Sequence, residues 1–284
     1  MDEFKELQKY VGRKMEFEDL ITATQVQKLS ATLDREDPMP KVGDPVPPGW
    51  HYIFFPKFPP TRSLGRDGMV PEIENGPPDP LPIRMFADSY AKFHRPLRIG
   101  DQARQIREIV SINAKEGRSG KLVFVTYRNT ISTSKGIATE DEWNIVFLEQ
   151  PREGARKPPP AQSAPASAAW ERTVNPTNTM LFRYSAVTFN PHRIHYDHPY
   201  ATQTEGYPGL VVHGPLTAVW LLELARNHNP GARMTEFKMR AKAPLYGGRP
   251  FRTLGTPRDG GKACDLWAIT PENTVAMEAE AFFA

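Results

Sequence analysis

Two series of strand-like runs, separated by glycine-containing or polar turns, restrict the fold of this chain more than any other feature. Residues 91–149 contain the first series and residues 234–284 the second. Runs joined by short turns favour antiparallel pairing, because a parallel connection needs a crossover of about a dozen residues or more. One strongly apolar stretch, GPLTAVWLLELARNH at 214–228, predicts a helix. The pattern therefore predicts the α+β class, with antiparallel sheets and few helices.

A short repeat indicates that the two series are copies of one unit. The pattern Pro-Leu-x-x-Gly occurs at 96–100 and again at 244–248, each time at a bend between strand-like runs. Between the series lies 151–169, which is rich in Pro, Ala and Ser and is typical of an extended linker. We therefore predict an N-terminal domain over 1–150 and a C-terminal domain over 170–284.

Four other segments carry local signals. Apolar residues at helical spacing predict helices in residues 1–33. The aromatic run HYIFF at 51–55 and the run MLFRYSAVTFN at 180–190 each predict a strand. Segment 37–82 holds many of the 29 prolines, and each proline removes a donor and fixes its backbone angle. This segment is therefore expected to be a long ordered loop.

Composition excludes several classes of function. The net charge of +3 comes from 36 basic and 33 acidic residues spread along the chain, which is too mild for a nucleic-acid-binding surface and better suited to a small anionic ligand. Cys264 is the single cysteine, so neither an internal disulfide nor a cysteine-based metal cluster can form. No secretory signal or membrane-spanning run is present, and we expect a cytoplasmic protein without a membrane partner.

Four of the seven histidines fall in one short segment, TFNPHRIHYDHPYATQTEGYPGLVVHGP, namely His192, His195, His198 and His213. A metal site is one explanation, because imidazoles and the carboxylate of Asp197 lie close together in sequence. Prolines 191 and 199 exclude a regular helix across the cluster, and no distant ligand is evident. We therefore expect no metal here.

General acid–base catalysis is the second explanation and the one that we favour. His195 would move a proton while Asn190 or Asp197 orients a water molecule. Gly214, at the start of the predicted helix, would offer a bare backbone N–H to a developing oxyanion. Histidines in loops also commonly satisfy buried backbone groups, and this structural interpretation is preferred for His192 and His198.

The segments FRYSAVTFNPHRIHYDHPYA and GLVVHGPLTA resemble the MaoC-like hydratases, and more closely the two-domain branch that includes mesaconyl-CoA and itaconyl-CoA hydratases. The resemblance extends to FHRPLRIGD, EGRSGKLVFVTYR and MRAKAPLYGGRPFRTLG, and covers most of residues 84–284. It implies a double hotdog fold, in which each half is a curled antiparallel sheet wrapped around a central helix. It also implies that the C-terminal half carries the hydratase loop and the N-terminal half shapes the acyl-CoA site.

This chain departs from the family loop D-x-N-P-x-H, in which Asp and His activate water. Thr188 occupies the Asp position, and His195 comes two residues later than the family His. The resemblance thus leaves His195 as the candidate base, Asn190 as the orienting amide and Asp197 as the nearby carboxylate. Gly214 matches the oxyanion-hole glycine.

The resemblance implies reversible hydration of a short, branched and dicarboxylic enoyl-CoA, of the itaconyl-CoA or mesaconyl-CoA type. No cofactor is implied, since coenzyme A is part of the substrate. An arginine would match the two oxygens of an acyl carboxylate, and basic residues of the C-terminal strands would suit the coenzyme A phosphates. The residues expected to contact the substrate are Thr188, Arg193, His213, Arg84, Arg183 and Arg240.

Two other functions remain open from the sequence. Hotdog folds also include thioesterases, which would release free thiol from an acyl-CoA. The missing aspartate is also compatible with a non-catalytic module that binds acyl-CoA or lipid. Whatever the function, a homodimer is expected, because a sheet edge left exposed is commonly covered by a second subunit.

Overall fold

The computed structural model describes residues 2–70, 77–117, 120–149 and 161–284. The strands are β1 (Lys14–Leu20), β2 (Ile83–Phe93), β3 (Gln102–Gly117), β4 (Gly120–Thr133), β5 (Gly136–Leu148), β6 (Trp170–Val174), β7 (Met234–Ala241), β8 (Phe251–Arg258), β9 (Ala263–Ile269) and β10 (Val275–Phe283). The α-helices are α1 (Ala23–Thr32), α2 (Asn178–Thr188) and α3 (Gly214–Asn227). The short helices are η1 (Asp2–Tyr10), η2 (Trp50–Ile53), η3 (Thr61–Ser63), η4 (Arg193–His195), η5 (Tyr200–Thr204) and η6 (Asp259–Gly261).

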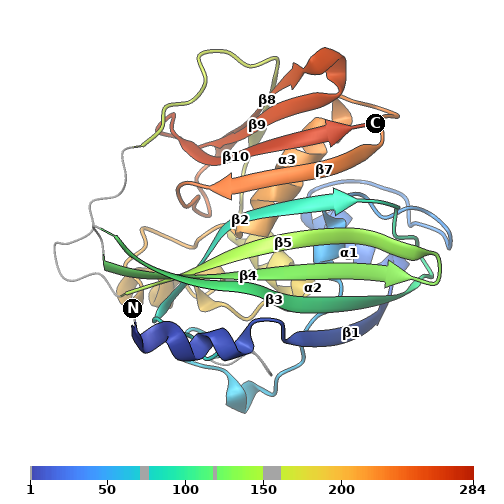
Figure 1. Cartoon of the computed structure of the whole chain (residues 1–284). Helices are drawn as coiled ribbons and strands as arrows, with labels where there is room; N and C mark the ends of the chain where they lie inside the picture. The colour runs from blue at the N-terminus through green and yellow to red at the C-terminus, as the bar shows by residue number, and fades with distance from the viewer. Residues whose placement is uncertain (1, 71–76, 118–119, 150–160) are drawn as a thin grey trace.

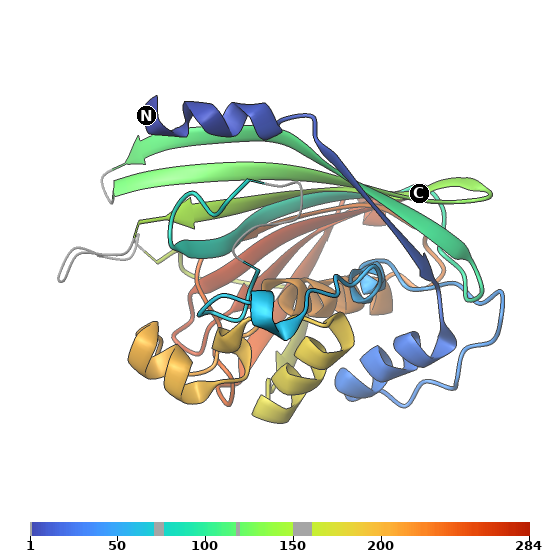
Figure 2. The ribbon, with the colours of Figure 1, turned by 90° about the horizontal axis from the view of Figure 1, so that it is seen from below.

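All of these strands form one antiparallel sheet in the order β1-β3-β4-β5-β2-β7-β10-β9-β8-β6. The second half of this order is the first half reversed, with β1 equivalent to β6, β2 to β7 and so on (Figure 1). The halves join where β2 pairs with β7, for example at Ala91 and Phe237. Figure 2 shows α1, α2 and α3 gathered on one face of this sheet. The α+β class and the duplicated antiparallel architecture are thus as predicted.

The two Pro-Leu-x-x-Gly bends have the same backbone bonds. In the N-terminal half the Val46 N–H donates to the Leu97 carbonyl at 2.7 Å, and in the C-terminal half the Val212 N–H donates to the Leu245 carbonyl at 2.8 Å. Both leucines are buried. The repeated motif therefore marks structurally equivalent positions in the two halves. In each half, the bend follows the first long strand and pairs with the segment that precedes the central helix or turn.

The central helix is complete in only one half. In the C-terminal half α3 is almost wholly buried, whereas the equivalent position of the N-terminal half holds only the single turn η2. The expectation of a central helix in each half is thus wrong for the N-terminal half. Gly49 precedes η2 with a φ of 84°, which suits glycine and turns the chain sharply after two prolines. The shorter element leaves open space between the helical layer and strands β1–β5.

A buried carboxylate ties the two halves together. Glu223 of α3 accepts a hydrogen bond from the Trp50 indole N–H at 3.1 Å, and it also accepts from Arg35 and, at 2.6 Å, from Arg226. Only 1% of the Glu223 side chain is exposed. A buried charge is tolerated when it is paired and hydrogen-bonded in this way. The network therefore positions η2 against α3.

Three local predictions from the sequence are wrong. Residues 14–20 form an edge strand rather than part of a helix, because Met15 and Phe17 alternate with charged residues and the segment pairs with β3. The aromatic run at 51–55 is not a strand, since most of it belongs to η2 and the residues that follow it. Residues 178–188 form helix α2, which begins after Thr177, whose hydroxyl accepts from the Met180 N–H at 3.1 Å.

The predicted linker 151–169 is only partly within the described residues. Residues 161–169 run along the C-terminal sheet, where the Ala164 N–H donates to the Asn273 carbonyl and the Ala169 N–H to the Gly255 carbonyl, both at 3.0 Å. This part is extended, but it is hydrogen-bonded to the domain. Among the helices that the structure describes, none is long and apolar enough to cross a membrane.

Candidate functional site

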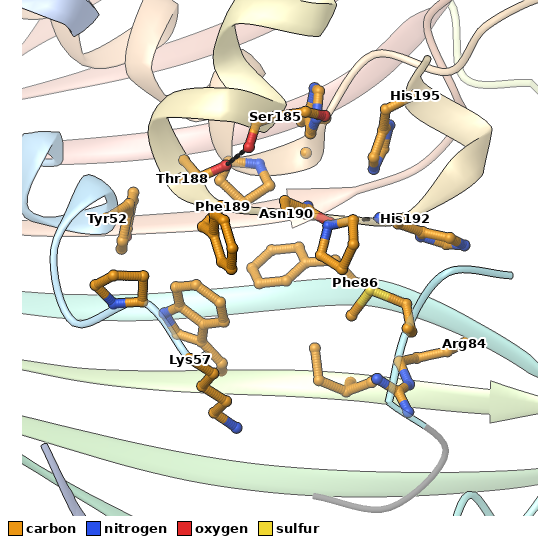
Figure 3. A pocket seen from close by; sticks show the side chains of 18 of the residues that line it. Tyr52, Lys57, Arg84, Phe86, Ser185, Thr188, Phe189, Asn190, His192 and His195 are labelled. Atoms are coloured by element: carbon orange, nitrogen blue, oxygen red, sulfur yellow. Dashed lines mark hydrogen bonds between the residues drawn. The ribbon is translucent and has the colours of Figure 1, made fainter. Parts of the chain in front are cut away.

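A cavity of about 1720 Å³ lies between the helical layer and the N-terminal half of the sheet. Its walls come from strands β1–β5, from the end of α2 and the loop that follows it, and from the start of α3. Figure 3 shows His195 on the helical side of this pocket and Arg84 on the sheet side. The cavity is larger than the usual range of about 300–1,000 Å³ for small-ligand sites, so an elongated ligand fits.

His195 is a buried imidazole that lines this cavity. Its Nδ1 lies 2.7 Å from the Val211 carbonyl oxygen, which can only accept a hydrogen bond. Nδ1 must therefore carry the proton, and Nε2 of the neutral ring keeps its lone pair. Burial, with a smaller contribution from His192, lowers the pKa of His195 to about 3. The ring is therefore a neutral proton acceptor.

His213 stacks on His195, with ring centroids 3.6 Å apart and an interplanar angle of 21°. The His213 Nε2 lies 2.9 Å from the Ser185 hydroxyl oxygen. Burial lowers the pKa of His213 well below its ordinary value, so this ring is neutral as well. Two neutral rings can stack closely without charge repulsion. His213 therefore packs against the plane of His195, and the His192 ring meets His195 edge to face with centroids 5.4 Å apart.

The loop after α2 is shaped by its own residues. Phe189 ends the helix in the left-handed region, with a φ of 52°. The Asn190 side-chain oxygen then accepts from the His192 N–H at 3.0 Å, a local turn that asparagine commonly makes. The Thr188 hydroxyl donates back to the Tyr184 carbonyl at 2.7 Å. These bonds hold Thr188, Asn190 and His192 along the cavity wall (Figure 3).

Gly214 begins α3 and lines the same cavity. The first amides of a helix have no partner within it, and they lie at the positive end of the helix dipole. Pro215 follows and has no N–H, so the Gly214 amide is the first donor at this end. A β-carbon at Gly214 would lie 3.5 Å from the Phe86 ring, in ordinary contact. The structure thus brings His195, Asn190, Thr188, His213 and Gly214 to one cavity.

Asp197 and Arg193 lie outside the cavity wall and bind each other. The Arg193 Nη2 donates to the Asp197 carboxylate at 2.7 Å, and the second carboxylate oxygen accepts from the Tyr200 N–H at 3.1 Å. Both residues therefore stabilise the loop between η4 and η5. The expectation that Asp197 replaces the missing family carboxylate is not supported by this position, and neither is a substrate contact for Arg193.

The other expected basic residues have different positions. Arg84 lines the cavity and pairs with Asp79. Arg183 is exposed on α2, and Arg240 is exposed on β7; neither lines the cavity. The basic residues expected to suit the coenzyme A phosphates alternate along β7 and just past its end, at Lys238, Arg240 and Lys242. Of these, only Lys242 lines the cavity.

Sequence reasoning missed several residues of the cavity. His192, interpreted as structural, lines the wall, and burial followed by the charge of Arg84 lowers its pKa to about 4. His51 and Asp141 form a buried pair with His51 Nε2 3.1 Å from the carboxylate. Arg107, on β3, is half-buried and lines the sheet side of the cavity. Ser185 could not be identified from the sequence, because this segment was expected to be a strand. In helix α2, Ser185 and Thr188 are three positions apart and share one face.

Among the described residues, no group of three or more His, Cys, Asp or Glu side chains is arranged to hold a metal ion.

Residues 49–247 match the family described as hydroxyacyl-thioester dehydratase type 2. The chain belongs to this family. Mesaconyl-C(4)-CoA hydratase of Chloroflexus aurantiacus is 43% identical to it over 270 residues, which cover 95% of each protein. The family and this relative are named for adding or removing water, and the chain is accordingly an enzyme of the hydratase and dehydratase class.

Solved structures confirm the fold. A MaoC-like dehydratase from Phytophthora capsici superposes with a TM-score of 0.69 at 14% identity, over 98% of this chain and 97% of that one. A Mycobacterium tuberculosis protein described as having a double hotdog fold superposes with a TM-score of 0.60 at 12% identity, over 96% of each chain. The predicted double hotdog fold is therefore confirmed.

Proposed function

We propose that this enzyme reversibly hydrates a short, branched, dicarboxylic enoyl-CoA, of the mesaconyl-CoA or itaconyl-CoA type. One observation carries the proposal: the Val211 carbonyl holds the proton of His195 on Nδ1, which leaves Nε2 as a base in the cavity that also contains the Gly214 amide. The relative from Chloroflexus aurantiacus, named for mesaconyl-C(4)-CoA, supports the acyl class. The cavity volume supports a ligand as long as an acyl-CoA.

In the hydration direction, His195 Nε2 accepts a proton from a water molecule that the Asn190 side chain helps to orient. The water oxygen bonds to the β-carbon, and the electrons of the double bond move to the thioester oxygen as an enolate. The Gly214 N–H stabilises this oxygen. His195 then returns a proton to the α-carbon, so that one water molecule is added in total.

The lowered pKa of His195 has a role in this scheme. A neutral ring is the form that can accept a proton, and burial keeps it neutral across the physiological range. The protonated ring forms only when the negative enolate forms beside it, and opposite charges attract strongly in a site that excludes water. His213, stacked on the ring, would act as a positioning residue.

The test is a panel of mesaconyl-CoA, itaconyl-CoA and crotonyl-CoA, followed through the absorbance of the conjugated thioester. We expect His195→Ala to lower kcat/KM about 100-fold or more, the usual size of a lost acid–base group. His198→Ala is the matched control, because His198 is exposed and outside the cavity wall. An unchanged His195→Ala enzyme would remove this ring from the mechanism. Release of free thiol would instead favour the thioesterase alternative, and absorbance unchanged with every substrate would favour a binding module.

We also propose that two chains associate as a homodimer in the cytoplasm. Strands β1 and β6 end the sheet that the described residues form, and a second subunit would cover such an edge. The mass of the protein in solution tests this proposal, since a monomer mass would contradict it.

A further inference from the structure

The sheet side of the cavity contains buried donors that have no acceptor. Within the described residues, the Arg107 Nε, the Trp143 Nε1 and the Arg84 Nε are buried without a hydrogen-bond partner, and all three residues line the cavity. Buried polar groups are normally satisfied, and an unsatisfied donor costs free energy. Donors that share one cavity indicate that the missing acceptor is a ligand with oxygen atoms.

Arg107 is the most unusual of these residues. Its guanidinium lies 4.2 Å from the centre of the Tyr127 ring and 5.9 Å from that of Trp143, and no ion pair joins it to a carboxylate of the described chain. Burial lowers its pKa, although arginine stays protonated in proteins. The residue as a whole is half-buried, and its Nε is shielded from solvent without an acceptor. An anion in the cavity would supply the acceptor that this donor lacks.

Asp141, the carboxylate whose charge acts on Arg107, does not fill this role. Asp141 lies two strands from Arg107 in the same cross-strand row, with Asn129 between them. One Asp141 oxygen accepts from the Asn129 amide at 2.7 Å, and the other faces His51 Nε2 at 3.1 Å. Asp141 therefore already has two partners. Its charge favours the protonated guanidinium from a distance, without occupying the N–H groups of Arg107.

The other arginine of the cavity is already paired. Arg84 donates to the Asp79 carboxylate, and its Nη2 also lies 3.3 Å from the Val70 carbonyl. Its positive charge acts on Arg107, whose pKa it lowers slightly in addition to the larger effect of burial. Two guanidinium groups within electrostatic range make this side of the cavity attractive to an anion. Of these two arginines, Arg107 has no carboxylate partner among the described residues.

A series of contacts connects Arg107 to the proposed oxyanion site. A β-carbon placed on Gly214 would lie 3.5 Å from the Phe86 ring, so the glycine faces this ring. The Phe86 and Trp143 rings meet edge to face at 5.4 Å, and the Arg107 guanidinium lies 5.9 Å from the centre of the Trp143 ring. Two aromatic rings therefore separate the amide that would hold the thioester oxygen from the unpaired cation. A short apolar segment with a carbonyl at one end and a carboxylate at the other matches this order of groups.

We propose that Arg107 binds the distal carboxylate of the acyl group and thereby selects dicarboxylic over monocarboxylic enoyl thioesters. The inference rests on the proposed function and identifies the residue that determines its specificity. The planar guanidinium can donate two parallel hydrogen bonds to a carboxylate, and Tyr127 holds its plane by stacking. The Trp143 Nε1 can supply a further donor. None of the arginines expected from the sequence has this position.

The kinetic test compares mesaconyl-CoA, which has the distal carboxylate, with crotonyl-CoA, which has a methyl group instead. We expect Arg107→Met to lower kcat/KM for mesaconyl-CoA about 100-fold, as for a lost charge-assisted hydrogen bond, and to leave crotonyl-CoA unchanged or improved. Arg107→Lys should recover part of the loss. Arg128→Met is the matched control, because Arg128 follows Tyr127 on β4, faces the other side of the sheet and pairs with Glu142. Equal losses for both substrates in Arg107→Met would overturn the inference.

A binding measurement separates this inference from the proposed function. By calorimetry, the wild-type enzyme should bind succinyl-CoA more tightly than butyryl-CoA, and Arg107→Met should abolish the difference; neither ligand can be hydrated. Equal affinity of the wild type for both would overturn the inference even if hydratase activity is present. A third outcome is that the enzyme lacks hydratase activity but still prefers succinyl-CoA, and that this preference depends on Arg107. That result would overturn the proposed reaction and support the carboxylate site. Arg107→Met should remain folded, because it breaks no ion pair or hydrogen bond with the described residues and keeps an unbranched side chain of similar length.

Discussion

Acid should destabilise this protein through His195. The unfolded chain binds a proton at this ring near the ordinary pKa of 6.5, whereas the folded chain binds it only near a pKa of about 3. Between these values the unfolded state holds more protons, so the free energy of unfolding rises with pH and falls as the solution becomes acidic. The stabilisation is therefore complete above about pH 6.5 and is lost progressively as the pH approaches about 3.

The size of the effect follows from the two pKa values. Each pH unit below 6.5 costs about 1.4 kcal/mol for one ring, so at about pH 5 the loss from His195 is about 2 kcal/mol. Burial also lowers the pKa values of His192 and His213, so these rings act in the same direction. A loss of this size is a large part of the usual net stability of about 5–15 kcal/mol.

Urea unfolding at several pH values between about 5 and 7.5 measures this dependence. We compare the wild type with His195→Gln, because carboxylates that titrate in the same range contribute equally to both and cancel in the difference. The variant should lose less stability on acidification, by about 2 kcal/mol at about pH 5. His198→Gln, at an exposed position, should follow the wild type. Parallel curves for His195→Gln and the wild type would refute the argument that burial holds this ring neutral.

Two further predictions concern stability, and urea unfolding checks both. Glu223→Ala should cost about 3 kcal/mol, because it leaves the buried Trp50 indole and neighbouring guanidinium groups without their acceptor; an unchanged midpoint would contradict this network. Gly49→Ala should cost about 2–4 kcal/mol, from a positive φ and a clash with Leu222. Gly12 has a similar φ and open space around it, so Gly12→Ala should lose only the stability that the positive φ costs. Equal losses of stability in the two variants would contradict the clash with Leu222.

The sequence predicted correctly those elements that depend on residues close together in the chain. The alternation in the long strands, the apolar helix from Gly214 and the repeated bends at Leu97 and Leu245 all depend on residues within a few positions of one another. The imidazoles around His195 and the glycine at the helix start, which the sequence grouped together, line one wall of the cavity. Short aromatic segments were misjudged, because helix α2 and turn η2 are decided by their caps and by tertiary packing.

The sequence by itself determined the antiparallel α+β class and the position of the histidine-rich loop, since both follow from spacing along the chain. Only the tertiary structure decided which charges are paired. Asp197 and Arg193 neutralise each other within the loop, while Arg107 is half-buried in a row where Asp141 already has its partners. Burial and pairing depend on what distant strands bring together, and a charge has a different energy in water, in an ion pair or alone in the interior.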